Sequence, residues 1–205
     1  MSLVEKVVAQ FARPTGFWGN IVGFIMAHRP SNLERNEWAI SLLNLQPSDR
    51  ILEIGFGPGV TIQKMSKSVT DGLIWGIDYS EVMFKQASKR NQRAISDGRV
   101  RLVLTSVSQL PSFNTPFDKI LAVNNFQFWD NKTDVLRRLR EQLCMGGIIA
   151  LVHQPRLPGA TEDDATEAGE RFARYLEMAG FKDIKMERKM MKPVSTVYVQ
   201  GRNVQ

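Results

Sequence analysis

The most informative stretch of the sequence is Ile51-Leu52-Glu53-Ile54-Gly55-Phe56-Gly57-Pro58-Gly59. A short apolar run typical of a strand leads into alternate glycines, and a helical pattern follows. Glycine adopts backbone angles that other residues avoid, and it lets a ligand approach the main chain closely. A glycine loop between a strand and a helix is typical of a nucleotide-cofactor site, and a plain tight turn is the alternative.

The spacing of the glycines argues against one class of cofactor. A dinucleotide-binding fingerprint reads Gly-x-Gly-x-x-Gly, but Val60 occupies the position of the third glycine and Pro58 stiffens the turn. An NAD-linked oxidoreductase is therefore a weak alternative. Asp78 ends a second predicted strand, Leu73 to Ile77, where a carboxylate can accept hydrogen bonds from both ribose hydroxyls of an adenosine cofactor. The alternative for Asp78 is an acid at a helix start.

The rest of the chain alternates between two patterns. Short β-rich runs alternate with helical segments, which predicts a parallel sheet with helices on both faces. The runs lie at 51–54, 73–77, 100–104, 119–123 and 148–152. A helix at 161–179 follows, and then two runs at 184–190 and 196–200 that we expect to pair antiparallel at a sheet edge. The prediction is a doubly wound, Rossmann-like α/β fold with seven strands, mostly parallel, the last one antiparallel.

Helix boundaries follow from local signals. Residues 1–47 have helical patterns, so we expect an N-terminal helical cap on a core at 48–205, all in one domain of 205 residues. Its third helix is predicted to open with a capping box at Ser31 and to end before Pro47. Asp130 is the predicted cap of the helix that carries Leu136 and Leu139.

Composition excludes several classes of protein. The chain is 43% hydrophobic and 23% charged, which is ordinary for a soluble globular protein, and its net charge of +6 favours anionic partners only mildly. Cys144 is the single cysteine, so neither an intramolecular disulfide nor a cysteine metal cluster is expected. The apolar stretch from Phe17 to Ala27 is too short to span a membrane, and we recognise no signal peptide. We expect a cytoplasmic protein without a metal.

Four motifs in this order resemble those of class I S-adenosylmethionine-dependent methyltransferases. They are the glycine loop at 51–59, Gly76-Ile77-Asp78-Tyr79-Ser80-Glu81-Val82-Met83, Phe117-Asp118-Lys119-Ile120, and Gly146-Gly147. The resemblance covers about residues 31 to 202 and is closest to small bacterial members similar to the ubiquinone and menaquinone methyltransferase group. It implies S-adenosylmethionine as the cofactor and S-adenosylhomocysteine as the product.

The resemblance also implies a cofactor site, residue by residue. Gly55, Phe56, Gly57 and Gly59 would wrap the methionine and ribose parts, with Glu53 near the amino group. Asp78 would hold the ribose hydroxyls, and Tyr79 would lie against the adenine, unless it serves ordinary packing. The family often has an acid after the third strand. This chain has Ser106 there, so the adenine contact would fall to the Ser106 hydroxyl or the Val107 amide.

The same resemblance implies where the acceptor binds. Asn124 and Asn125 follow the fourth strand, which the family's topology puts beside the transferred methyl group, so Asn124 is a candidate for cofactor contact and both are candidates for catalysis. The nearby Phe128 is a candidate acceptor contact. Packing in a core is the alternative for Phe126, Phe128 and Trp129. No Asn-Pro-Pro-Tyr motif is present, so DNA adenine and release-factor methylation are disfavoured.

Two histidines are the neutral-pH candidates for a general base. Methyl transfer is an in-line displacement in which a base is optional. His153 follows the fifth strand at the edge where ligands bind in such sheets, and a surface or capping role is its alternative. His28 is more simply a solvated histidine. The N-terminal helices are a candidate lid, in which we expect an apolar acceptor pocket lined by Phe11, Phe17, Trp18 and Met26, or else a plain cover for the sheet edge.

The sequence therefore predicts methyl transfer to a small, partly apolar metabolite. RNA or protein methylation is the runner-up, because lysines and arginines recur at 85–93 and 137–140, where solvated helix faces are the alternative. A non-catalytic cofactor-binding subunit is a further alternative. Nucleic acid and stable membrane insertion are not expected, and the oligomeric state is open.

Overall fold

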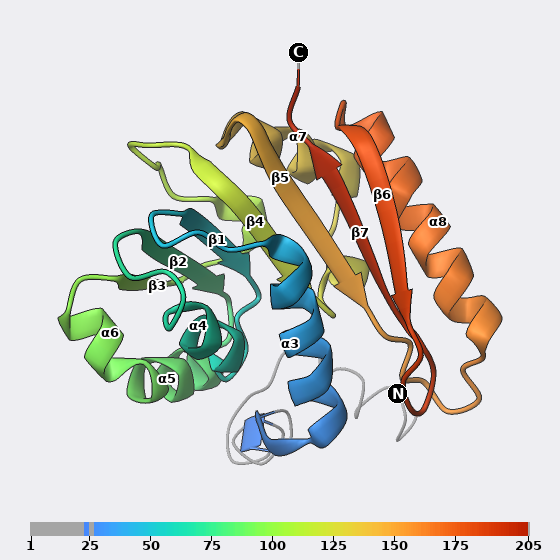
Figure 1. Ribbon diagram of the computed structural model, residues 1–205, viewed down its shortest axis with the longest axis horizontal. Helices are drawn as coiled ribbons and strands as arrows, with labels where there is room; N and C mark the ends of the chain where they lie inside the picture. Colours follow the sequence, from blue (N-terminus) through green and yellow to red (C-terminus); the bar gives the residue numbers. More distant parts are fainter. Residues whose placement is uncertain (1–22, 25–26, 205) are drawn as a thin grey trace. The chain divides into compact units, whose positions relative to one another are not determined.

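The computed structural model describes residues 23–24 and 27–204, in which helices and strands alternate along the chain (Figure 1). The elements are α3 (Pro30–Leu43), β1 (Arg50–Ile54), α4 (Val60–Met65), β2 (Leu73–Asp78), α5 (Glu81–Arg90), α6 (Gln92–Ser96), β3 (Val100–Leu104), η1 (Val107–Gln109), β4 (Phe117–Val123), η2 (Phe126–Phe128), α7 (Lys132–Glu141), β5 (Leu143–His153), α8 (Glu162–Met178), β6 (Lys182–Lys189) and β7 (Thr196–Arg202), where η marks a short 3-10 helix.

The seven strands form one sheet in the order β3-β2-β1-β4-β5-β7-β6. Strands β2 and β3 pair in parallel, as do β4 and β5. Strand β7 runs antiparallel to both of its neighbours, β5 and β6. The predicted fold is confirmed, including the antiparallel pair at the edge.

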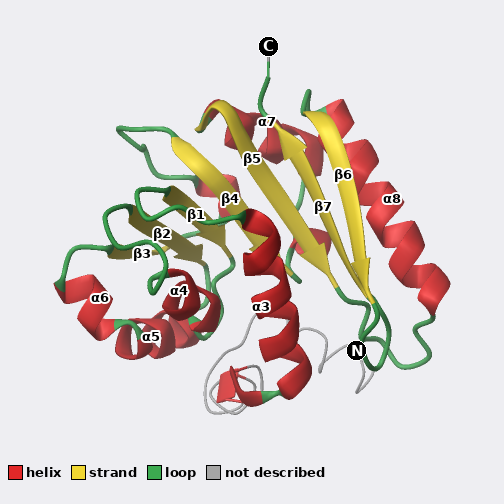
Figure 2. Cartoon of the chain, viewed as in Figure 1, coloured by secondary structure: helices red, strands yellow, loops and turns green. Residues whose placement is uncertain are grey.

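The chain forms two compact units, and strand β1 contributes residues to both. Of the described residues, the first unit holds those up to Asp49 and Glu53–Leu110, and the second holds Arg50–Leu52 and those from Pro111 onward. In the first, α4 and α5 pack on β2, and α5 and α6 pack on β3. In the second, α8 packs along β7 and β6 (Figure 2). The interpretation as a single domain stays a prediction.

Each unit buries its own large side chains. The first buries aliphatic residues, namely Leu43, Ile62, Met65, Ile74 and Ile77. The second buries aromatic residues as well as aliphatic ones, and its buried aromatic residues include Phe117, Phe126, Phe172, Phe181 and Tyr198. Apolar burial of this extent is the main favourable term in folding. No helix in the described part of the chain is long and apolar enough to cross a membrane.

Two helix starts differ from the prediction. Helix α3 begins at Pro30 with Arg29 as its N-cap and without a side-chain cap, so the capping box at Ser31 is wrong. Proline at the first helical position is already set for helix and lacks the amide that a cap would satisfy. Helix α7 has Asn131, not Asp130, as its N-cap, and Asn131 is in the left-handed conformation without a capping hydrogen bond.

Strand β5 begins earlier than predicted. Leu143 pairs with Phe117, and the next pair is Ile148 with Lys119, so extra residues bulge out between them. Gly146 in this bulge has φ +79°. The prediction began at Ile148 because the bulge interrupts the apolar pattern, while the strand resumes on both sides of it.

Candidate active site

The glycine loop between β1 and α4 has the backbone conformation that its sequence predicts. Gly55, Gly57 and Gly59 have φ values of +67°, +52° and +76°, in the left-handed region. A β-carbon added to Gly59 would lie 2.7 Å from the β-carbon of Ala87 on α5. Strain and close approach therefore both require glycine at position 59.

Helix α5 and the residue after it hold this loop in place. The Asn91 Nδ2 donates to the carbonyl oxygens of Gly59 (3.0 Å) and Ala87 (2.9 Å). The Arg90 guanidinium donates to the Pro58 carbonyl at 2.8 Å. The sequence analysis did not predict the hydrogen bonds that Asn91 and Arg90 make to the loop, because these bonds join segments far apart in the chain and leave no local pattern.

Asp78 ends β2 and faces the loop. It is 7% exposed, and its Oδ2 accepts from the Gly57 amide (2.8 Å) while its Oδ1 accepts from the Ser80 amide (2.9 Å). Burial raises the pKa of Asp78, and these amide hydrogen bonds oppose the rise. The N-cap of α5 is Ser80, and Asp78 lies two residues before it, so the alternative of an acid at a helix start stays open. The carboxylate has about four lone-pair sites, so it can still accept a hydrogen bond from a ribose hydroxyl.

Glu53 is a buried acid on β1. It is 2% exposed, and burial raises its pKa well above the usual value. A hydrogen bond with Thr61 lowers the pKa, and the charge of Asp78 raises it. Its Oε2 has no hydrogen-bond partner among the residues that the structure describes. A buried carboxylate oxygen of this kind suits a ligand that brings its own donor, such as the ammonium group of an amino acid.

The candidate adenine contacts lie at the ends of β2 and β3. Tyr79, directly after β2, is 41% exposed, so its ring is open to a ligand. The Thr105 amide donates to the Asp78 carbonyl (2.9 Å), which ties the end of β3 to that of β2. Ser106 caps η1, with Oγ accepting from the Ser108 amide at 3.2 Å, so its hydroxyl hydrogen stays available for a ligand. Phe56 is buried and Val107 begins η1.

Comparison with known proteins agrees with this geometry. A family described as a methyltransferase domain matches residues 51–147. The uncharacterized methyltransferase YdaC of Bacillus subtilis is 35% identical over 177 residues, which cover 86% of this chain and 94% of the relative. The chain belongs to the class I S-adenosylmethionine-dependent methyltransferases. The methyltransferase thus takes S-adenosylmethionine as its cofactor.

Other relatives are more distant. The 27-O-demethylrifamycin SV methyltransferase of Amycolatopsis mediterranei is 30% identical over 110 residues, covering 54% of this chain and 40% of the relative. The N-methyltransferase NodS of Bradyrhizobium japonicum, solved with S-adenosylhomocysteine, superposes with a TM-score of 0.72 at 14% identity, covering 98% of both chains. A methyltransferase of Aquifex aeolicus superposes with a TM-score of 0.72 at 19% identity, covering 90% of this chain and 98% of that one. These structures share the fold.

A second group of candidate residues lies in the other unit, in the segment 124–129 after β4, which we call the amide loop. Asn124 has φ +53°. Its amide donates to the Val152 carbonyl, and its Oδ1 accepts from the Gln154 amide, both at 2.8 Å. Asn124 therefore joins the carboxyl ends of β4 and β5.

The aromatic residues of the amide loop divide into two kinds. Phe126 and Trp129 are buried, as the core alternative predicts, and Phe126 contacts Phe172 of α8 with ring centroids 4.7 Å apart. The Trp129 Nε1 donates to the Asn125 Oδ1 at 3.0 Å, so Asn125 has a structural partner. Phe128 is 43% exposed and open to a ligand.

The two histidines differ in their surroundings. His153 ends β5, is half-buried, and has its ring centroid 5.6 Å from that of Phe172. His28 is exposed, with Nδ1 2.8 Å from the Phe24 carbonyl oxygen. Of the two, His153 keeps the position at the carboxyl edge of the sheet that a general base requires.

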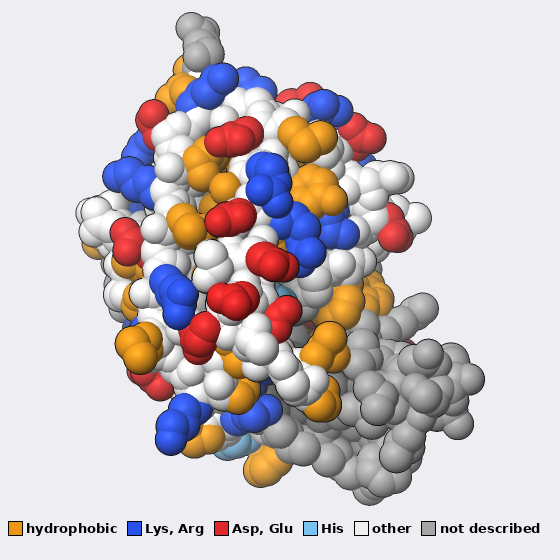
Figure 3. Space-filling view, turned by 90° about the vertical axis from the view of Figure 1, so that its right-hand side faces the viewer, with side chains coloured by type: hydrophobic (Ala, Val, Ile, Leu, Met, Phe, Trp, Pro, Cys, Tyr) orange, Lys and Arg blue, Asp and Glu red, His pale blue; other side chains and the backbone are white. Residues whose placement is uncertain are grey.

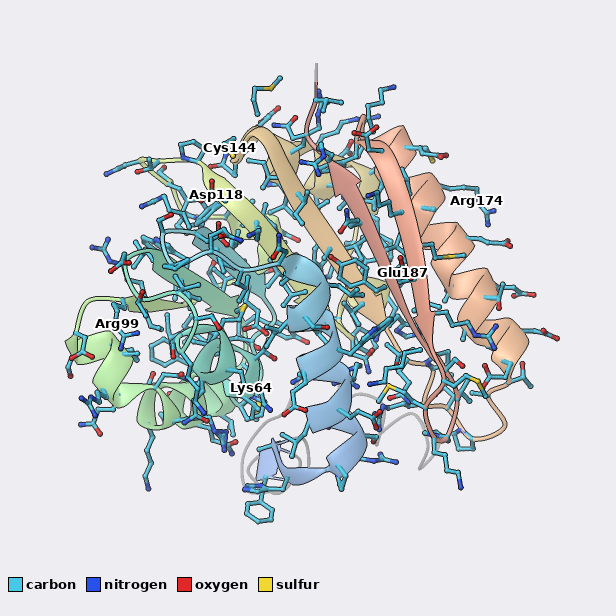
Figure 4. The ribbon with its side chains drawn as sticks, in the orientation of Figure 1. Lys64, Arg99, Asp118, Cys144, Arg174 and Glu187 are labelled. Carbon is cyan, nitrogen blue, oxygen red and sulfur yellow. The ribbon has the colours of Figure 1, made fainter. Side chains whose placement is uncertain are left out.

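The remaining candidates are the lid residues and the single cysteine. The candidate lid residues Phe11, Phe17, Trp18 and Met26 lie outside the described residues. Cys144 lies beside Asp118 (Figure 4), with Sγ 3.6 Å from Oδ1, and burial chiefly raises the thiol pKa. Asp118 also accepts a hydrogen bond from the Arg50 amide at 2.7 Å, and this bond joins β4 to β1.

Proposed function

We propose that the methyltransferase transfers its methyl group to a small, partly apolar metabolite. The observation that carries this proposal is the make-up of the amide loop, which contains aromatic and carboxamide side chains and no ionisable group. Its exposed Phe128 offers an apolar surface. Sites for small molecules have this character, with apolar walls and a few placed polar groups.

The roles of the site residues are part of the proposal. Residues of the first unit bind the cofactor, namely Glu53, Gly55, Phe56, Gly57, Gly59, Asp78, Tyr79, Ser106 and Val107. Asn124 and Asn125 shape the acceptor side, with Phe128 as an apolar contact. Both groups follow carboxyl ends of strands, where ligands bind in open α/β sheets. Relatives named for small products, such as the rifamycin methyltransferase, support this class of acceptor.

The reaction needs alignment more than acid–base chemistry. The acceptor's lone pair forms a bond to the methyl carbon while the carbon–sulfur bond breaks, and its electron pair stays on the sulfur of S-adenosylhomocysteine. Holding the two reactants in line can supply much of the rate enhancement. If the acceptor is a hydroxyl, His153 is the candidate base that would take its proton.

Contacts of the basic residues favour a small acceptor over RNA. In α7, Arg137 pairs with Asp134 at 2.7 Å, and the Arg140 Nε donates to the Asn203 Oδ1 at 3.1 Å. On the face that carries α8, acidic and basic side chains intermix (Figure 3). A nucleic-acid surface is typically a continuous basic patch.

The test follows the methyl group. Methyl-labelled S-adenosylmethionine is incubated with the enzyme and a fractionated bacterial extract, and label is counted in small molecules, RNA and protein. We expect label in the small-molecule fraction that Asp78→Ala abolishes and that Asp71→Ala, an exposed acid of the same unit, retains. Label confined to RNA or protein would refute the small acceptor. Cofactor binding without label in any fraction would favour the alternative that the chain is a non-catalytic cofactor-binding subunit.

A further inference from the structure

Gln127 lies in the middle of the amide loop, between two phenylalanines. It belongs to η2 and is half-buried. Its Nε2 donates to the Asn124 carbonyl at 2.9 Å. Its Oε1 is buried and has no hydrogen-bond partner in the described part of the chain.

The orientation of this carboxamide is fixed by its partner. The Asn124 carbonyl can only accept a hydrogen bond, so the side-chain nitrogen of Gln127 must face it and the oxygen must face away. The other two side-chain oxygens of the loop are engaged, because the Asn124 Oδ1 accepts from Gln154 and the Asn125 Oδ1 accepts from Trp129. Among the side-chain oxygens of the loop, that of Gln127 is therefore the one that lacks a hydrogen-bond donor in the described part of the chain.

A buried carbonyl oxygen without a donor is unfavourable, so it suits a state in which a ligand brings one. The donor is expected to be neutral, because residues 124–129 contain no acid and Asp130, the next residue, already interacts with Lys132. The Lys132 ammonium already lies 5.9 Å from the Phe126 ring centroid, and a second cation nearby would be repelled. These features favour a hydroxyl group.

We propose that the Gln127 Oε1 accepts a hydrogen bond from the hydroxyl group of the methyl acceptor, which makes the enzyme an O-methyltransferase. This inference rests on the proposed function. Gln127 holds the hydroxyl hydrogen, so the oxygen's lone pairs point elsewhere and one can attack the methyl carbon. The new carbon–oxygen bond forms, the methyl–sulfur bond breaks, and the proton leaves to water, directly or by way of the candidate base His153.

The first test needs no turnover. Phenol and its methyl ether anisole share a ring, but anisole has no hydrogen to donate. Each is titrated by NMR into the wild type with S-adenosylhomocysteine present. We expect phenol to bind about three- to tenfold more tightly than anisole, since a net neutral hydrogen bond has about this strength.

Two variants make this test specific. In Gln127→Met, which keeps the length of the side chain without its oxygen, the preference for phenol is expected to vanish. In Gln92→Met, which changes an exposed glutamine of α6, the preference is expected to stay. Equal binding of both probes to the wild type, no binding of either, or a preference that persists in Gln127→Met would overturn the inference.

The second test uses a pH-dependent rescue. In Gln127→Glu, the ionised carboxylate would face the Asn124 carbonyl and repel it, while the protonated acid would donate to that carbonyl and still accept from the hydroxyl. Transfer of label by this variant, relative to the wild type, is expected to rise at least about tenfold as the pH falls through the pKa of the new acid, one unit being a tenfold change. A flat ratio would contradict the assigned role.

The binding test and the labelling test distinguish failure of the proposed function from failure of the role assigned to Gln127. Discrimination between phenol and anisole without label in any fraction would refute catalysis and leave the hydroxyl site standing. Label in small molecules, together with equal phenol and anisole binding, would support the proposed function and refute the role of Gln127.

Discussion

The cofactor loop, residues 55–59, and the amide loop, residues 124–129, each follow a strand of the same sheet but are held by different means. The cofactor loop depends on backbone conformation, since each of its glycines has a positive φ. The amide loop depends on side-chain hydrogen bonds, in which Asn124, Asn125 and Trp129 take part. The first loop is therefore shaped by its main chain, and the second by its side chains.

The two loops also differ in charge. Beside the cofactor loop lie two buried acids, Glu53 and Asp78, whose pKa values burial raises. S-adenosylmethionine carries a sulfonium and an ammonium group, so in the proposed site these acids would offset its positive charge. The amide loop has no ionisable side chain. The neutral acceptor that we propose agrees with this absence of charge.

The largest effect is expected where the cofactor loop depends on glycine. Gly59→Ala places a β-carbon 2.7 Å from that of Ala87 at φ +76°. We expect the free energy of unfolding to fall by about 2–5 kcal/mol, from left-handed strain plus overpacking. Urea denaturation measures this fall, and binding of S-adenosylhomocysteine should weaken with it.

Gly98→Ala is the matched control. Gly98 has the same φ of +76°, but nothing lies within 4 Å of an added β-carbon. Its substitution should cost only the left-handed strain, about 1–2 kcal/mol. Equal losses for the two variants would show that the close approach of α5 to the loop does not matter.

The next effect concerns the buried charge beside the cofactor loop. Because burial raises the pKa of Glu53, the folded chain binds this proton more tightly than the unfolded chain. The stability that this proton confers is complete below the unfolded pKa and is lost as the pH rises through the folded pKa. We expect the wild type to lose free energy of unfolding relative to Glu53→Gln as the pH rises, by at most about 1.4 kcal/mol per pH unit.

Glu81→Gln tests the sign of this effect. Glu81 on α5 is exposed, and its hydrogen bond with Lys85 lowers its pKa. Its contribution is therefore present at neutral pH and is lost as the pH falls through the lowered pKa. Urea denaturation over a series of pH values compares the two variants with the wild type. A stability difference for Glu53→Gln that does not change with pH would mean that folding does not raise the pKa of Glu53.

The sequence predicts the cofactor loop well because its requirements are local. Glycine at three alternate positions after a strand directly indicates an unusual backbone conformation. Asp78 is predicted because it stands at the end of the next strand. Asn91 escaped prediction because its hydrogen bond to the Gly59 carbonyl joins the loop to the end of α5, a tertiary contact without a local pattern.

The amide loop was located but not understood from the sequence. The resemblance to methyltransferases placed Asn124 and Asn125 there, but which oxygen each amide group satisfies depends on how the ends of β4 and β5 meet. The sequence signal at Gln127 is a polar residue between two phenylalanines. That its side-chain oxygen lacks a donor becomes clear only when the hydrogen bonds of the loop are known. Strand β5 shows the same limit, because its bulge interrupts the apolar pattern while pairing continues on both sides.

The smallest effect tests whether side-chain hydrogen bonds hold the amide loop. Trp129→Phe removes the Nε1 donor and leaves the Asn125 Oδ1 without its 3.0 Å partner. In a double-mutant cycle with Asn125→Ala, we expect a coupling of about 0.5–1.5 kcal/mol in the free energy of unfolding, the net value of a neutral hydrogen bond. Affinity for S-adenosylhomocysteine should stay that of the wild type, because the changes leave the cofactor loop intact. A coupling near zero would mean that packing of the Phe126 and Trp129 rings, 5.0 Å apart, orders the loop without help from the amides.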